Sequence, residues 1–173
     1  LMKTLKIYPA IFLFFSLTFL MYFPAIEEDF IWDDDVYVSE NKQLKSGEGL
    51  KNIWLKPGAT AQYYPLVFTS FWLEYRIWGE DTSGYHIINM VLHASSALLL
   101  WRILILLSLP GAGLAALIFL MHPVNVESVA WITERKNTLS GLFYLGSLTF
   151  YLSFLQLENL PLFSKKKVLL FIN

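Results

Sequence analysis

The sequence predicts an all-α polytopic membrane protein, and its composition and the grouping of its apolar residues are the observations that predict it. Hydrophobic residues make up 55% of the 173 positions and charged residues only 16%, whereas ordinary soluble domains carry about 25% charged residues. The mean hydropathy is +0.49. Because the apolar residues lie in long runs and not at the spacing of one amphipathic core, several membrane spans fit the chain better than one globular core does.

The first apolar run covers residues 7–26, which is long enough to cross a hydrocarbon core of about 30 Å. A cleaved signal peptide is the alternative, but its apolar region would be about 7 to 15 residues long, and no small-residue cleavage site precedes Glu27. We therefore expect a retained membrane anchor. The later apolar segments cover residues 85–109, 112–132 and 139–157, and another begins at residue 168.

The second and third spans are expected to form a helical hairpin, because Pro110-Gly111 is a strong turn signal between them. The third segment is purely apolar only as far as Met121, which is too short to cross alone. It must continue through His122-Pro123 towards Trp131. Polar groups are therefore expected at or near membrane depth.

The distribution of lysines predicts the orientation of the chain. Lys3 and Lys6 precede the first span, and the run 165–167 follows an even number of crossings. Both groups then lie on one side of the membrane, which the positive-inside rule assigns to the cytoplasm. Residues 27–84 become a large first outer loop, and the segment 122–137 also reaches the outer face.

The second half of the outer loop, from Tyr63 to Trp78, is expected to form an interfacial helix. Its aromatic residues recur at helical spacing and include Phe68, Phe71, Trp72 and Tyr75. Aromatic side chains collect at headgroup depth, so anchoring of the loop in the membrane interface is favoured over direct contact with a substrate.

Several functional classes are disfavoured by what the sequence lacks. The net charge of -1 provides no basic surface for nucleic acid. The absence of cysteine excludes disulfides, thiolate metal sites and a cysteine nucleophile. The local signatures of dinucleotide-binding, P-loop, zincin and α/β-hydrolase proteins are also absent.

Three adjacent carboxylates, Asp33, Asp34 and Asp35, form the sharpest candidate site. They follow the outer end of the first span and are framed by Trp32 and Tyr37. Repulsion between like charges and partial burial raise the pKa of a carboxylate, which is how it becomes a general base. A divalent cation bound by the carboxylate oxygens is a second interpretation, and a solvated acidic loop is the third.

A second candidate segment lies between the third and fourth spans and contains ionisable residues at or near membrane depth, where such residues are costly and usually functional. Arg135 and Lys136 suit a phosphate, although cations that flank a helix also extend towards the interface without binding anything. His93 and Arg102 in the second span have similar status, with a helix contact as the alternative for His93 and extension towards the cytoplasm as the alternative for Arg102. The candidates of the segment itself are His122, Glu127, Glu134, Arg135 and Lys136.

Four segments together resemble the TMTC-type O-mannosyltransferases and their bacterial relatives, which are polytopic glycosyltransferases of the GT-C superfamily. The segments read FIWDDDVYVSEN (30–41), YYPL (63–66), GYHIIN (84–89) and HPVNVESVAWI (122–132). The resemblance implies a GT-C-type helix bundle in a multi-pass membrane protein, with the bacterial inner membrane as the expected location. Tetratricopeptide repeats commonly follow the membrane part in this family, and the apolar stretch that opens at Val168 indicates that the natural protein continues.

The resemblance also implies a reaction and a set of roles. The donor would be a polyprenyl-phosphate sugar, with mannose as the candidate sugar, and the acceptor would be a hydroxyl of a protein or glycan on the outer or luminal face. Asp34, then Asp35, then Asp33 would be the first choices for the catalytic base. His122, Glu127, Glu134, Arg135 and Lys136 would line the same cavity and bind the substrate or the lipid phosphate. No cofactor is expected, apart from the divalent cation considered above.

Two other functions remain open from the residues alone. The chain could be a non-catalytic membrane scaffold with downstream protein-binding repeats, in which case the acidic loop is merely solvated. It could also be part of a transporter in which His122 and Glu127 form a proton or substrate path. No internal symmetry between two halves supports the transporter.

Overall fold

The computed structural model describes residues 7–155, and these residues form helices, turns and irregular segments without a strand. Lys3, Lys6, the lysines 165–167 and the apolar segment from residue 168 lie outside the described residues. The helical class predicted from the sequence is confirmed. Two helices are long and apolar enough to cross a membrane, and a bent pair of helices raises the number of candidate spans to three among the described residues.

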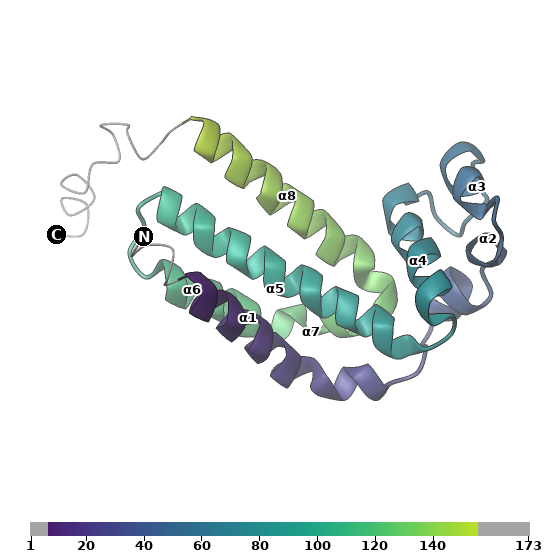
Figure 1. Cartoon of the computed structure of the whole chain (residues 1–173), viewed down its shortest axis with the longest axis horizontal. Helices are drawn as coiled ribbons and strands as arrows, with labels where there is room; N and C mark the ends of the chain where they lie inside the picture. Colours follow the sequence, from purple (N-terminus) through teal and green to yellow (C-terminus); the bar gives the residue numbers. More distant parts are fainter. Residues whose placement is uncertain (1–6, 156–173) are drawn as a thin grey trace.

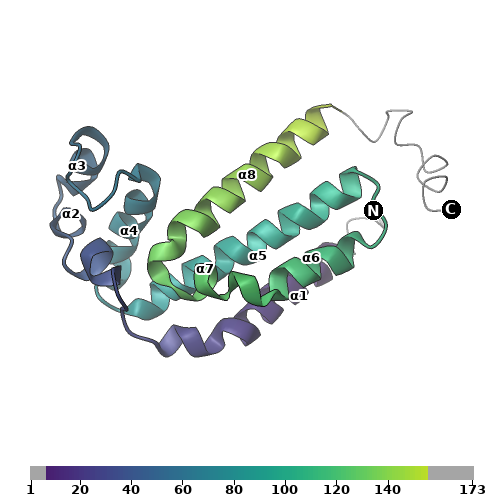
Figure 2. The same ribbon diagram turned by 180° about the vertical axis from the view of Figure 1, so that it is seen from behind.

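Four helices form an elongated bundle, and α5 (Thr82–Leu106) lies at its centre. Helix α8 (Arg135–Phe154) packs along one side of α5, whereas α1 (Ile7–Tyr22) and α6 (Ala112–Met121) pack along another (Figures 1 and 2). Helix α1 contains no charged residue, and α5 begins where the Asp81 side chain accepts a hydrogen bond of 3.0 Å from the Ser83 amide. The first two predicted spans therefore correspond to α1, with the 3₁₀ turn Phe23–Glu27, and to α5.

The third predicted span is broken. Helix α6 ends at Met121, a 3₁₀ turn occupies Pro123–Asn125, and the short helix α7 (Val126–Ala130) continues at an angle of 48°. Pro123 cannot continue the hydrogen-bond ladder of α6, which explains the break. A second 3₁₀ turn, Ile132–Glu134, then leads into α8, which is long enough to cross but less apolar than α1 and α5 and is not among the candidate spans.

The long loop between α1 and α5 folds into a helical cap at one end of the bundle (Figure 1). It contains the π-helical turn Asp35–Ser39 and helices α2 (Lys42–Lys45), α3 (Gly49–Leu55) and α4 (Pro65–Trp78). Gly79, with a φ of 61°, ends α4 in a conformation that favours glycine. The cap places the acidic segment and α4 against the ends of α5 and α8.

The aromatic stripe of α4 packs against protein. It does not form the lipid anchor that we expected. Phe68 and Phe71 are completely buried, and they form a core with Tyr37 of the π-helical turn and Tyr85 of α5. The large apolar side chains of α4 that remain exposed are Leu66, Leu73 and Ile77. A periodic aromatic pattern therefore predicted the helix, but the face that it marks is the inward one.

Candidate functional site

Asp34 is the structural anchor of the acidic loop. Its side chain is 1% exposed, and one carboxylate oxygen, Oδ1, accepts hydrogen bonds from the backbone amide of Thr133, at 2.9 Å, and from the Thr133 hydroxyl. The other oxygen, Oδ2, accepts one from the Ile31 amide at 3.1 Å. Burial raises the pKa of Asp34, although the bonds from Thr133 and Ile31 act in the opposite direction. The carboxylate therefore ties the loop to the turn before α8.

A pH-dependent stability follows from Asp34. Because its pKa in the folded protein lies above the ordinary value of 3.8, the folded state binds more protons than the unfolded state between these two values, and stability falls as the pH rises through this window. Asp34→Asn does not titrate. We expect the melting temperature of Asp34→Asn, relative to that of the unchanged protein, to increase from pH 4 upwards until the folded pKa is passed; a constant difference would contradict the raised pKa.

Asp33 and Asp35 have different surroundings from Asp34 and from each other. Asp35 is exposed, and its Oδ1 accepts a hydrogen bond of 2.9 Å from the Ser39 hydroxyl. Asp33 is half-buried, and its Oδ1 is enclosed without a hydrogen-bond partner among the described residues. Asp33 also interacts electrostatically with Lys136. Of the three carboxylates, Asp33 therefore combines a free oxygen with a nearby cation.

Lys136 lies at the start of α8 within a small polar cluster. Its Nζ is 2.6 Å from the Oε1 of Glu134 and 5.8 Å from the centre of the Trp131 ring. The second oxygen of Glu134 accepts a hydrogen bond from the Asn137 amide group. An ammonium group has three N–H donors, so the ion pair with Glu134 leaves Lys136 able to bind a further anion.

Arg135, by contrast, is fully enclosed by protein groups. Its side chain is 0% exposed, and its guanidinium makes five hydrogen bonds, which equals its number of N–H groups. The acceptors are both carboxylate oxygens of Glu74, the Asn89 and Ser70 side chains and the Tyr85 carbonyl. Arg135 thus joins α4, α5 and α8, and no N–H remains for the phosphate that the sequence led us to assign to it.

His122 and Glu127 lie on different parts of the broken third segment, and both are exposed. The Nδ1 atom of His122 accepts a hydrogen bond of 3.2 Å from the Val124 amide, so this ring stabilises the turn after α6. Glu127 lies on α7. In the second span, the Nε2 atom of His93 is 3.0 Å from the Leu120 carbonyl oxygen and links α5 to α6. His93 therefore makes a helix contact.

The described residues contain no group of three histidine, aspartate or glutamate side chains placed to hold a metal ion. The reason is visible in the acidic loop, where Asp34 turns towards Thr133 and Asp35 towards Ser39. Adjacent carboxylates in the sequence therefore do not converge on one point in space.

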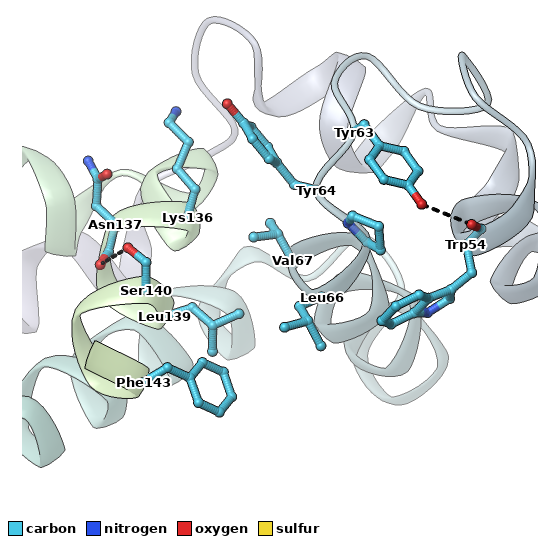
Figure 3. Close-up of a pocket in the computed structure, with 11 residues that line it drawn as sticks. Trp54, Tyr63, Tyr64, Leu66, Val67, Lys136, Asn137, Leu139, Ser140 and Phe143 are labelled. Atoms are coloured by element: carbon cyan, nitrogen blue, oxygen red, sulfur yellow. Dashed lines mark hydrogen bonds between the residues drawn. The ribbon is translucent and has the colours of Figure 1, made fainter. Parts of the chain in front are cut away.

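A cleft of about 630 Å³ lies between the cap and the first half of α8, and we call it the apolar cleft (Figure 3). Lys136 and Asn137 line it near the start of α8, and Leu139 and Phe143 line it further along the helix (Figure 3). The facing wall comes from the cap and consists of Trp54, Tyr63, Tyr64, Pro65, Leu66 and Val67. The apolar cleft thus combines a mostly apolar wall with one cation.

Sequence reasoning missed several residues of this region. Thr133, Glu74 and Asn89 hold the acidic loop and Arg135 in place, but none was a candidate. Asn89 and His86 lie in the segment GYHIIN that carries part of the family resemblance, and Glu74 is a lone carboxylate on an aromatic helix. A polar residue alone on an apolar helix was the signal that could have identified Glu74 and Asn89.

Comparison with curated proteins finds relatives in one group. The chain is 31% identical over 150 residues to protein O-mannosyl-transferase tmtc2 of Xenopus laevis, covering 79% of this chain and 18% of that protein. It is 29% identical over 141 residues to protein O-mannosyl-transferase Tmtc1 of Drosophila melanogaster, covering 75% of this chain and 16% of that protein. It is 27% identical over 132 residues to human protein O-mannosyl-transferase TMTC3, covering 70% and 14%.

No family model matches the chain, and no solved structure matches it. The chain spans only 14–18% of the length of the curated relatives described above. The matches nevertheless cover the greater part of this chain. The relationship to the TMTC-type protein O-mannosyl-transferases that the four quoted segments predict is therefore confirmed.

Proposed function

We propose that this chain supplies part of the active site of a membrane glycosyltransferase, which transfers mannose from a polyprenyl-phosphate donor to a hydroxyl group of a protein serine or threonine on the outer or luminal face. The relatives are named protein O-mannosyl-transferases, which supports mannose and a protein acceptor. The acidic loop follows the end of α1, which supports a site at the level where a lipid-linked donor would present its headgroup. The full reaction belongs to the protein that contains this chain.

One observation carries the proposal: a lysine lines the polar end of an apolar cleft, and a half-buried carboxylate outside the cleft lining interacts with it electrostatically. Asp33 supplies the carboxylate and Lys136 the cation. From Lys136 to Phe143 the axis of α8 advances by about 10 Å, so the apolar cleft extends away from the polar groups along this helix. A lipid phosphate needs a cation for its head and an apolar surface for its chain.

The chemistry that these groups support is an inverting displacement. Asp33 takes the proton from the acceptor hydroxyl, and that oxygen forms a bond to C1 of mannose. The bond between C1 and the phosphate oxygen breaks, and its electron pair leaves with the polyprenyl phosphate. Lys136 stabilises the negative charge that develops on the leaving phosphate.

Removing the charge of Lys136 tests the phosphate assignment. A hydrogen bond to a charged group contributes about 1.5–3 kcal/mol, so we expect Lys136→Gln to raise the donor KM by about ten- to a hundredfold. Lys136→Arg should retain most of the donor affinity. The matched control is Lys51→Gln on α3, which is exposed and lies outside the apolar cleft. Equal donor KM values for both glutamine variants would contradict a role in phosphate binding.

Transfer of labelled mannose from polyprenyl-phosphate mannose to protein, measured in membranes that contain the full-length protein, tests the proposed function. We expect product that is sensitive to mild alkaline elimination, as a serine- or threonine-linked sugar should be. If no sugar moves from any polyprenyl-phosphate donor while the folded protein remains in the membrane, a non-catalytic scaffold becomes the better interpretation.

A further inference from the structure

A second cleft, of about 290 Å³, adjoins the acidic loop and shares no lining residue with the apolar cleft. We call it the acidic cleft. Trp32, which directly precedes the three aspartates, lines one wall, and Trp131 packs edge-on against it with 4.9 Å between the ring centres. The Nζ atom of Lys136 also lies over the Trp131 ring, 5.8 Å from the ring centre. The acidic cleft therefore meets the proposed reaction centre at this pair of tryptophans.

The charges around the acidic cleft have one sign. Glu28, Asp29 and Glu127 line it and are exposed, and its lining contains no lysine or arginine. Glu28 and Asp29 follow the 3₁₀ turn after α1, whereas Glu127 comes from α7. Carboxylates from two separate segments thus create a negative potential in one small cleft, which attracts a cation and repels a lipid phosphate.

Buried polar groups give the acidic cleft a second recognition feature. His86 of α5 lines the cleft and is 3% exposed, yet neither ring nitrogen makes a hydrogen bond of good geometry among the described residues. Weak hydrogen bonds link the ring to the backbones of Glu28 and Ala130, and the carboxylates of Asp34 and Glu28 interact with it electrostatically. The indole N–H of Trp131 is enclosed without a partner among the described residues. Buried polar groups normally have partners, so an incoming hydroxyl or peptide group would satisfy this N–H.

We propose that the acidic cleft binds the acceptor polypeptide, and that it selects serine or threonine residues flanked by lysine or arginine. This inference rests on the proposed function, because it assigns the second substrate of the same reaction. The carboxylates hold the cation, the two tryptophans offer ring surfaces to its aliphatic stem, and the enclosed indole N–H of Trp131 binds a polar group of the peptide. Donor and acceptor then approach the acidic loop through different clefts.

A neutral hexose is the other ligand that tryptophans and carboxylates bind. The net negative charge of the lining favours the cationic peptide, because three carboxylates without a counter-charge contribute nothing to the recognition of an uncharged sugar beyond hydrogen bonds. The two ligands predict different outcomes when the charges are removed. Loss of affinity for a basic peptide supports the acceptor, whereas loss of affinity for the donor supports the sugar.

The test compares two labelled peptides with the full-length protein in detergent. One carries a threonine flanked by two lysines, and the other carries glutamine in place of each lysine. We expect the lysine peptide to have the lower KM. The double variant Glu28→Gln/Glu127→Gln should raise that KM about tenfold at low salt, while the KM of the glutamine peptide and of the donor stay within about twofold. The matched control is Glu48→Gln, an exposed carboxylate outside the cleft.

A binding measurement separates this inference from the proposed function. Fluorescence anisotropy of the lysine peptide with alanine in place of threonine requires no transfer, so it reports on the acidic cleft even if the protein moves no sugar. Equal affinity for the lysine and glutamine peptides, or equal loss in the Glu48→Gln control, would overturn the acceptor assignment. A raised donor KM with unchanged peptide affinity in the double variant would also overturn it, in favour of the sugar.

Discussion

Asp33→Asn is expected to lower the kcat of mannose transfer by about 10²- to 10⁴-fold, which is the usual contribution of a general base. Asp33 is our choice because its Oδ1 has no hydrogen-bond partner in the described part of the chain and its carboxylate interacts electrostatically with Lys136. Asparagine has nearly the same shape but cannot take the proton of the acceptor hydroxyl. The donor KM should change little, because the phosphate is held at Lys136. Single-turnover transfer in detergent measures the chemical step directly.

The neighbouring aspartates provide the controls. Asp35→Asn should retain most of the activity, because this exposed side chain is bonded to Ser39 within its own turn. Asp34→Asn should reduce both stability and kcat, because Asp34 positions the loop through Thr133 and Ile31. Thr133→Ser, which keeps the hydroxyl donor, should resemble the unchanged protein. Full activity in a folded Asp33→Asn variant would return the role of base to Asp34.

The sequence predicted best those features that depend on residues close to one another along the chain. Apolar runs predicted helices close to α1 and α5, and the helical spacing of Phe68 and Phe71 predicted α4. The acidic loop was also recognised as a candidate site, because it contains three adjacent aspartates. These features depend on neighbours within a few turns of one helix, and such neighbours are visible along the sequence.

Pairings between distant segments were not predictable in the same way. Asp34 and Thr133 are separated by 99 positions, and Arg135 and Glu74 by 61. Periodicity shows which side of a helix faces inward, but it does not name the partner on another helix. Asp34 was accordingly assigned as the catalytic base and Arg135 to phosphate binding, whereas the structure shows each of them bonded to protein groups.

The break of the third span shows a related limit. Pro123 signals an interruption, but the angle of 48° between α6 and α7 and the second turn at Ile132–Glu134 depend on how the segment packs against α5 and α8. That packing brings Thr133 to Asp34 and Trp131 to Trp32. The geometry of the candidate site is therefore a tertiary property of this broken segment.

Removal of one member of the buried ion pair between Arg135 and Glu74 should have a large effect on the stability of the cap. Glu74 is 5% exposed, and burial raises its pKa while the Arg135 charge lowers it. Removal of one member of a buried pair usually costs about 3–5 kcal/mol, because the other is left buried without its counter-charge. We expect Arg135→Met to lower the stability by this amount, measured by tryptophan fluorescence during thermal unfolding in detergent.

A double variant separates the cost of an orphaned charge from the loss of the contact itself. Because well-packed apolar residues often replace a buried ion pair without loss, Arg135→Met/Glu74→Met should be more stable than Arg135→Met alone. The exposed pair of Lys45 and Glu80, at 3.0 Å, is the control, and Glu80→Gln should leave the unfolding temperature unchanged. If Arg135→Met unfolds at the same temperature as the unchanged protein, the buried pair does not hold α4 against α5 and α8. If it unfolds early and the double variant recovers, Arg135 stabilises the fold and positions the start of α8, where Lys136 meets the acidic loop.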